Sequence, residues 1–185
     1  MHAAVSAALI LSLALGTAAP ATPDTPVQPK TAMRLTSTAF ADGQPIPKKF
    51  SYENAGISPA LAWSDAPAGT KSFALVCDDP DAPSGDWVHW VIYAIPATVS
   101  ALPEHVAAIE KLPNGARQGV NDFGRVGYGG PCPPPGKPHR YFFRLYALDA
   151  EPVLGPLPKK SELLQAIRGH ILAEAQLIGT YQRNR

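Results

Sequence analysis

The segment WVHWVIYAI, residues 87–95, constrains the fold of this 185-residue chain more than any other. Alternate side chains of a strand point to opposite faces, and both alternating sets of this segment are almost wholly apolar. One set is Trp87, His89, Val91 and Tyr93, and the other is Val88, Trp90 and Ile92. A strand that is apolar on both faces is a central strand, covered on both sides. The chain is therefore expected to form a sheet with protein packed against each face.

Three more segments are expected to be strands, because each is an apolar run bounded by turn residues. They are TKSFALVCDD (70–79), HRYFFRLYALD (139–149) and ILAEAQLIGTYQR (171–183). Weaker strand or extended character is present in AMRLTSTAF (32–40) and NAGISPALAWSDAP (54–67). The 21 prolines, against a usual share of about 5%, favour long ordered loops. The connection over 96–127 is long enough to predict a ligand-shaping role.

SELLQAIRGH, residues 161–170, predicts one short helix near the end of the chain. Ser161 is expected to be its N-cap, and Leu163, Leu164 and Ile167 are expected to share one face. The residues alone therefore predict one β-dominated domain with a late helix.

The first 21 residues contain no Lys, Arg, Asp or Glu and include an apolar run that is short for a membrane helix. They are interpreted as a signal peptide, followed by a flexible tether over 22–32 and a domain over 33–185. The protein is then expected to be periplasmic or secreted. Because no Lys or Arg precedes the apolar run, an uncleaved anchor or a misassigned start stays an alternative.

Charge and cysteine content exclude some partners. A formal net charge of +1 gives no long-range field that would recruit nucleic acid. No CxxC pair indicates zinc or thioredoxin-like chemistry. The two cysteines, Cys77 and Cys132, are compatible with a disulfide or with two separate buried thiols.

Polar side chains that could take part in binding or catalysis gather in DDPDAPSGDW (78–87), at His89, and in GYGGPCPPPGKPHRY (127–141). Strand alternation puts His139, Tyr141 and Phe143 on one face, with Arg140 and Arg144 on the other, solvated face. If strands 87–95 and 139–149 are neighbours, His89 and His139 meet at one end of the sheet. A lone histidine in an apolar strand is usually a core residue, but two that each follow a rigid loop favour a pocket.

Such a pocket suits an anion. A histidine next to an aspartate favours the charged imidazolium, which donates to phosphate or carboxylate. The Gly129–Gly130 turn is expected to present backbone N–H groups as an anion nest, held rigid by Pro131. Trp87, Tyr128 and Tyr141 would supply walls with polar tips. A remaining aspartate would accept from an ammonium group, so a phosphorylated amino alcohol fits.

The motifs DPDAP, W-x-H and GGPCPP…PHRY, in this order, resemble the phosphatidylethanolamine-binding protein (PEBP) family, also called Raf kinase inhibitor-like proteins. The YGGPCPP form and the ending HILAEAQLIGTYQR resemble its bacterial YbhB/YbcL subgroup. The resemblance implies a mainly β fold, with a central antiparallel sheet, a second small sheet, a short late helix and an anion cavity near one end of the sheet. It also implies cis peptides at Asp79–Pro80 or Ala82–Pro83.

By motif, the resemblance assigns nine residues to the cavity: Asp79, Ala82, Pro83, Trp87, His89, Gly130, Pro131, His139 and Tyr141. The residue-level reasoning adds Asp81, Tyr128 and Gly129. Cys132 stands where mammalian members have a second proline, and the loop before Trp87 is shorter than theirs. These differences leave the fine ligand specificity open, and the kinase inhibition known for animal members stays an open alternative.

We therefore expect a non-enzymatic protein without a cofactor that binds a small anionic or zwitterionic ligand, such as phosphate, phosphoethanolamine or a phospholipid head group. A weak hydrolase using Cys132 and His139 is the main alternative, although no third group that would orient the histidine is visible in the sequence. Asp79, Asp81, His89 and His139 are acceptable metal ligands but lack a paired spacing, so no metal is expected. PCPPPGKP could instead bind an aromatic groove as a polyproline helix. A homodimer and peripheral contact with lipid head groups also stay open.

Overall fold

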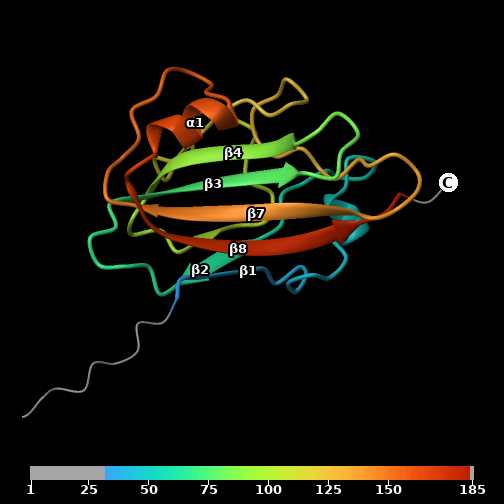
Figure 1. The fold of residues 1–185 in the computed structure, drawn as a ribbon, viewed down its shortest axis with the longest axis horizontal. Coiled ribbons are helices and arrows are strands. Elements are labelled where there is room, and N and C mark those ends of the chain that lie inside the picture. Colours follow the sequence, from blue (N-terminus) through green and yellow to red (C-terminus); the bar gives the residue numbers. More distant parts are fainter. Residues whose placement is uncertain (1–31, 184–185) are drawn as a thin grey trace, which may run out of the picture. The chain divides into compact units, whose positions relative to one another are not determined.

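The computed structural model describes residues 32–183, which form two antiparallel sheets and a helix (Figure 1). The larger sheet has the order β6-β4-β3-β7-β8. Its strands are β3 (Ser72–Asp79), β4 (Trp87–Pro96), β6 (Arg117–Gln118), β7 (His139–Leu148) and β8 (Ile171–Tyr181). The smaller sheet has the order β1-β2-β5, formed by Arg34–Thr36, Leu61–Ser64 and Ala101–Leu102. A 3-10 turn, η1 (Lys48–Phe50), and the helix α1 (Lys160–Ala166) complete the elements.

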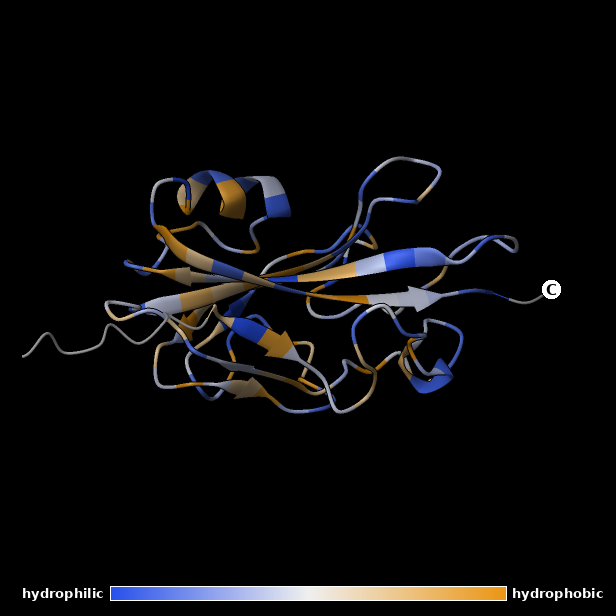
Figure 2. Ribbon diagram, turned by 60° about the horizontal axis from the view of Figure 1, so that its bottom comes forward, coloured by the Kyte–Doolittle hydropathy of each residue, from blue (hydrophilic) through white to orange (hydrophobic). Residues whose placement is uncertain are grey.

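The larger sheet lies between two layers (Figure 2). One face packs against the smaller sheet, where Leu35, Leu61 and Trp63 join Phe73 and Leu75 of β3 in a buried core. The opposite face carries a second core, in which Val76, Val91 and Tyr146 pack with Leu163 of α1 and with Ile167, the residue that follows the helix. All eight residues of β3 are buried, which agrees with its position in the middle of the sheet. The mainly β fold with a central antiparallel sheet, a small second sheet and a late helix is confirmed.

The expected alternation along β4 is wrong after His89. Trp90 belongs to the core facing the smaller sheet, while Val88 and Val91 belong to the core beneath α1. The register with β3 shifts at this point, since Cys77 pairs with Trp90 but Asp78 pairs with Val88. A β-bulge inserts one extra residue into a strand and reverses the faces beyond it. Trp87 and His89 therefore share a face with Trp90 and Ile92 rather than with Val91 and Tyr93.

The condition that strands 87–95 and 139–149 be neighbours is not met, and the expected N-cap of the helix is corrected. Strands β4 and β7 are not neighbours, because β3 lies between them and pairs with both. The helix begins at Lys160 with Lys159 as its N-cap, so Ser161 lies inside the first turn. Glu162 supplies the cap by accepting a hydrogen bond of 2.8 Å from the backbone N–H of Lys159. The predicted apolar face is present, with Leu163 and Ile167 buried.

The described peptide bonds are all trans, so the expected cis bonds at Asp79–Pro80 and Ala82–Pro83 are absent. The trans form is favoured by about 0.5–1 kcal/mol even before proline. The predicted signal peptide, 1–21, and nearly all of the predicted tether, 22–32, lie outside the described residues. Within residues 32–183, no helix is long and apolar enough to cross a membrane.

Candidate functional site

A cavity of about 210 Å³ lies at the edge of the larger sheet where β3 ends and where β4 and β7 begin. Antiparallel pairing brings these three strand ends together, so the loops that precede β4 and β7 form the walls. The lining residues are Asp79, Ala82, Pro83, Ser84, Trp87, His89, Phe123, Cys132, Pro133, Pro134 and His139. Six of the twelve predicted site residues therefore line one cavity: Asp79, Ala82, Pro83, Trp87, His89 and His139.

Each histidine in the cavity has one ring nitrogen engaged by the protein. Nδ1 of His89 lies 2.7 Å from the carbonyl oxygen of Gly129, and Nδ1 of His139 lies 2.8 Å from a carboxylate oxygen of Asp79. A carbonyl can only accept, so His89 carries a proton on Nδ1 and donates it. A carboxylate likewise accepts from His139. In both rings Nε2 is left as the nitrogen available to a ligand.

Burial controls the charge of His89, which is 2% exposed. Desolvation lowers the pKa of His89, and the Gly129 carbonyl and the Asp79 carboxylate offset this effect only in part. The ring is therefore neutral near pH 7, and its Nε2 is a hydrogen-bond acceptor. Such an acceptor suits a protonated phosphate oxygen or an ammonium group.

Phe123 completes the cavity wall, and the sequence reasoning missed it. Its ring centroid lies 5.3 Å from that of His89 and 5.5 Å from that of Trp87, both edge to face. Asn121 holds Phe123 in place, since its side-chain oxygen accepts from the backbone N–H groups of Phe123 and Arg125. Asparagine commonly makes this local turn, so N-D-F-G within the long 96–127 connection was the available signal.

The structure corrects the predicted anion nest at Gly129, the first of its two glycines. The backbone N–H of Gly129 donates to the carbonyl oxygen of His89 at 2.7 Å and so is not free for an anion. A Cβ on Gly129 would lie 2.6 Å from the Phe123 ring, and a Cβ on Gly130 would lie 2.5 Å from backbone atoms of Phe50 and Tyr52. The glycines therefore allow close packing of the loop that builds the wall.

Three other predicted residues lie behind the wall. Pro131 accepts a backbone hydrogen bond of 3.1 Å from Tyr52, which ties the proline loop to the segment after η1. The Tyr128 ring packs in the core, 5.7 Å from the Trp90 ring. Tyr141 is 1% exposed, and its ring lies 5.1 Å from that of His89. They support the cavity without lining it.

Asp81 lies outside the cavity lining and binds Arg140. Its carboxylate accepts from the backbone N–H, Nε and Nη2 of Arg140 at 3.0, 2.8 and 2.7 Å. These hydrogen bonds lower the pKa of Asp81 to about 2. Asp79 accepts from the Asp81 backbone N–H as well as from His139, so both aspartates are engaged. Neither carboxylate is therefore unpaired, although each keeps lone pairs that could accept from an ammonium group.

The two cysteines are free thiols in different surroundings. Cys77 is buried in the core, where desolvation raises the pKa of its thiol. Cys132 is half-buried in the cavity wall.

The hydrolase alternative needs a third group that orients His139, which the sequence did not reveal. Asp79 is such a group, since its carboxylate accepts from Nδ1 of His139. No hydrogen bond joins Cys132 to His139 among the described residues, and residues 32–183 contain no cluster of three or more metal-ligating side chains.

The family model described as phosphatidylethanolamine-binding protein matches residues 36–182. A UPF0098 protein of Methanothermobacter thermautotrophicus is 51% identical over 151 residues, which cover 82% of this chain and 99% of the relative. The UPF0098 protein YbhB of Escherichia coli is 44% identical over 126 residues, covering 64% of this chain and 80% of YbhB.

Solved structures agree with these sequence matches. A PEBP homologue of Chlamydia trachomatis, CT736, superposes with a TM-score of 0.75 at 44% identity and covers 83% of this chain and 99% of its own. YbcL of Escherichia coli, described as a member of the mammalian PEBP family, superposes with a TM-score of 0.77 at 37% identity and covers 83% of this chain and 100% of its own. This chain therefore belongs to the phosphatidylethanolamine-binding protein family.

Proposed function

We propose that this chain binds the phosphate of a phosphate ester or of a phospholipid head group in the cavity between β3, β4 and β7, and that it does not catalyse a reaction of this ligand. Family membership supports the coarser statement that it is a small-ligand-binding protein of the PEBP type. The observation that carries the finer proposal is the pair of histidines, each fixed through Nδ1 and each with Nε2 left for a ligand.

The size and chemistry of the cavity support a small polar group. Its volume of about 210 Å³ is below the roughly 300–1,000 Å³ of pockets for drug-sized ligands. His139, whose Nδ1 donates to Asp79, would donate from Nε2 to a phosphate oxygen in its imidazolium form, and neutral His89 would accept from a phosphate hydroxyl. Both aspartates near the site are engaged, so the phosphate rather than an ammonium group would supply most of the recognition. A location in the periplasm or outside the cell remains part of the proposal.

Calorimetric titration with inorganic phosphate and with phosphoethanolamine tests this function. We expect His139→Ala to weaken binding of both by about 10- to 100-fold, because a hydrogen bond to a charged group contributes about 1.5–3 kcal/mol. His170→Ala is the matched control. Its Nδ1 also lies 2.8 Å from a carboxylate, that of Asp149, but both side chains are about half exposed and neither lines the cavity.

Failure of the wild-type protein to bind either compound would refute the proposal, and so would equal binding by His139→Ala and wild type. Phosphoethanolamine recovered unchanged after incubation is expected. Release of inorganic phosphate that Cys132→Ala abolishes would instead favour the hydrolase alternative, which neither the family matches nor the solved structures support.

A further inference from the structure

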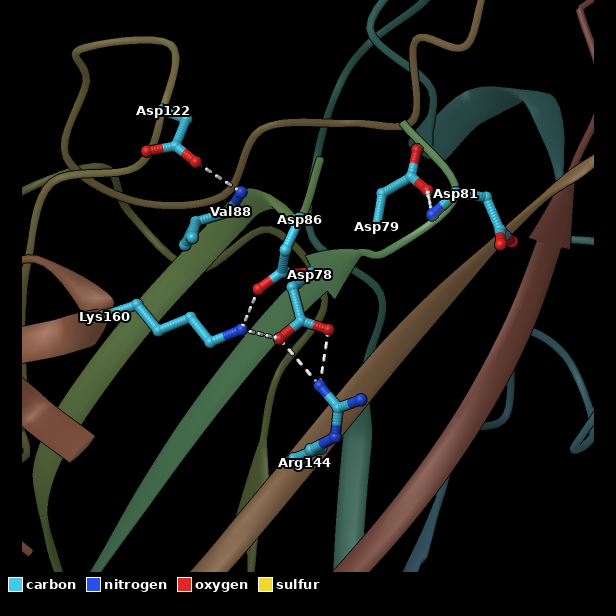
Figure 3. A network of polar contacts seen from close by, with 8 residues as sticks. All are labelled: Asp78, Asp79, Asp81, Asp86, Val88, Asp122, Arg144 and Lys160. Carbon is cyan, nitrogen blue, oxygen red and sulfur yellow. Dashed lines mark hydrogen bonds and ion pairs between the residues drawn. The ribbon is translucent and has the colours of Figure 1, made fainter. Parts of the chain in front are cut away.

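Asp78 and Asp79 are consecutive residues at the end of β3, and their carboxylates lie on opposite faces of the sheet. Asp79 faces the cavity and holds His139, whereas Asp78 is fully buried on the side of α1. Nη1 of Arg144 donates to both oxygens of Asp78 at 2.5 and 2.7 Å, and Nζ of Lys160 donates at 2.5 Å (Figure 3). A buried carboxylate with two cationic donors holds the last residues of β3 in place.

Lys160 extends this contact to the rim of the cavity. Its Nζ also donates to Asp86, the residue that directly precedes Trp87 in the cavity wall (Figure 3). Burial lowers the pKa of Lys160, but hydrogen bonds to Asp78 and Asp86 outweigh it and the pKa is raised. Lys160 is therefore charged. Lys160 is the first residue of α1, and its side chain connects the helix to the end of β3 and to the end of the loop over residues 80–86, here called the rim loop.

The rim loop supplies three cavity-lining residues, Ala82, Pro83 and Ser84. Asp81 fixes one end of the loop to Arg140, and Asp86 fixes the other end to Lys160. Asp86 is 46% exposed, so without Lys160 its carboxylate would turn to water and release that end. A loop that must become ordered when the ligand binds lowers the affinity.

We propose that Lys160 is a positioning residue for ligand binding, which holds the rim loop through Asp86 and the end of β3 through Asp78 from the face opposite the cavity. The affinity part of this inference rests on the proposed phosphate binding, whereas the ordering of the rim does not. Arg144 also binds Asp78, so we expect the sheet to keep this buried ion pair when Lys160 is replaced.

The test combines phosphate titration with a double-mutant cycle. We expect Lys160→Met and Asp86→Asn each to weaken binding of inorganic phosphate by about tenfold, comparable to the lower end of the effect of losing an outer partner of a metal ligand. The double variant should bind no more weakly than Lys160→Met alone, and Lys160→Arg should restore most of the affinity. Lys159→Met is the matched control, since this neighbouring lysine is exposed and forms no ion pair among the described residues. Additive effects of the two substitutions, or equal loss in Lys159→Met, would overturn the inference.

A second measurement needs no ligand. The protein is labelled with 5-fluorotryptophan, and the ¹⁹F resonance of Trp87 is assigned with Trp87→Phe. In Lys160→Met we expect this resonance to broaden or divide, while those of Trp63 and Trp90 in the core stay unchanged. If Lys160→Met does not fold, Asp86→Asn decides, because it removes only a half-exposed carboxylate. An unchanged Trp87 resonance in either folded variant refutes the positioning role. Absence of phosphate binding in the wild type refutes the proposed function and leaves the resonance result valid.

Discussion

Single residues at the cavity each have a role that depends on a specific neighbour. His89 and His139 are held through Nδ1 by a carbonyl and a carboxylate, which decides the nitrogen that a ligand would meet. Gly130 is needed for a different reason, because backbone atoms of Phe50 and Tyr52 occupy the space that a side chain would take. The loop that forms the wall therefore requires a glycine at position 130 as well as its polar groups.

Gly130→Ala is expected to destabilise the protein by about 1–3 kcal/mol, the usual effect of overpacking a filled interior. The physical reason is a contact of 2.5 Å between the new Cβ and backbone atoms, which cannot move aside as a flexible side chain can. Urea unfolding measures the change. Gly155→Ala is the control, with nothing within 4 Å of its Cβ, and should stay within about 0.5 kcal/mol of wild type. Equal stability of the two variants would contradict this explanation.

At the scale of elements, the site depends on how the loops are attached to the strands. The rim loop is joined to the start of β7 by Asp81 and Arg140 and to α1 by Asp86 and Lys160. The bulge in β4 turns Trp90 toward the core on the cavity side of the sheet and leaves His89 at the cavity. The cavity therefore depends both on the strand ends and on the loops attached to them.

The attachment of the rim loop to β7 predicts a pH dependence of stability. The pKa of Asp81 is about 2 in the folded protein and about 4 in an unfolded chain, so the folded state binds this proton less strongly. The stabilisation is complete above about pH 4 and is lost as the pH falls through about 2. Urea unfolding of wild type and Asp81→Asn should differ at pH 7, and the difference should shrink across this interval.

Arg140→Gln is the control for the cause of this effect, because it removes the guanidinium donors and leaves the carboxylate and the backbone N–H. It should flatten the pH dependence in the same interval. If Asp81→Asn kept the full wild-type slope between pH 4 and 2, another group would be responsible.

At the scale of the whole molecule, the arrangement in three layers determines which side chains are accessible to solvent. The larger sheet is covered by the smaller sheet on one face and by α1 on the other, so its centre is buried, whereas the candidate cavity lies at the ends of its strands (Figure 2). Cys77 lies in this buried centre at 1% exposure, while Cys132 lies in the cavity wall. The layers thus give two cysteines of one chain different reactivity.

This difference predicts that one thiol of the native protein reacts with a disulfide reagent such as DTNB, and that peptide mass spectrometry identifies it as Cys132. Both thiols should react in urea, since unfolding exposes Cys77 and removes the desolvation that raises its pKa. Cys132→Ser should show no fast reaction in the folded state. Two reactive thiols in the native protein, or none, would contradict the assigned burial.

Much of the fold could be predicted because its signals are local. Short apolar runs between turn residues identified β3, β4, β7 and β8, and the apolar face of 161–170 identified α1. The motif resemblance added the antiparallel arrangement and the second sheet. The same motifs named six residues that line the cavity, since the site lies where strands begin and end. Phe123 could not be assigned to the site, because N-D-F-G indicates a local turn and not the contact of this turn with His89.

The sequence by itself determined the four long strands of the larger sheet, the burial of His139, Tyr141 and Phe143 on one face of β7, and the loops rich in proline and glycine, since these depend on patterns within a few residues. Only the tertiary structure decided that β3 separates β4 from β7, that β4 has a bulge at His89, that Gly129 and Gly130 serve packing, and that Asp78 and Lys160 meet on the α1 side of the sheet. The reason is physical: strand order, close contacts and ion pairs join residues far apart in the chain, and their partners are selected by the packing of the whole core.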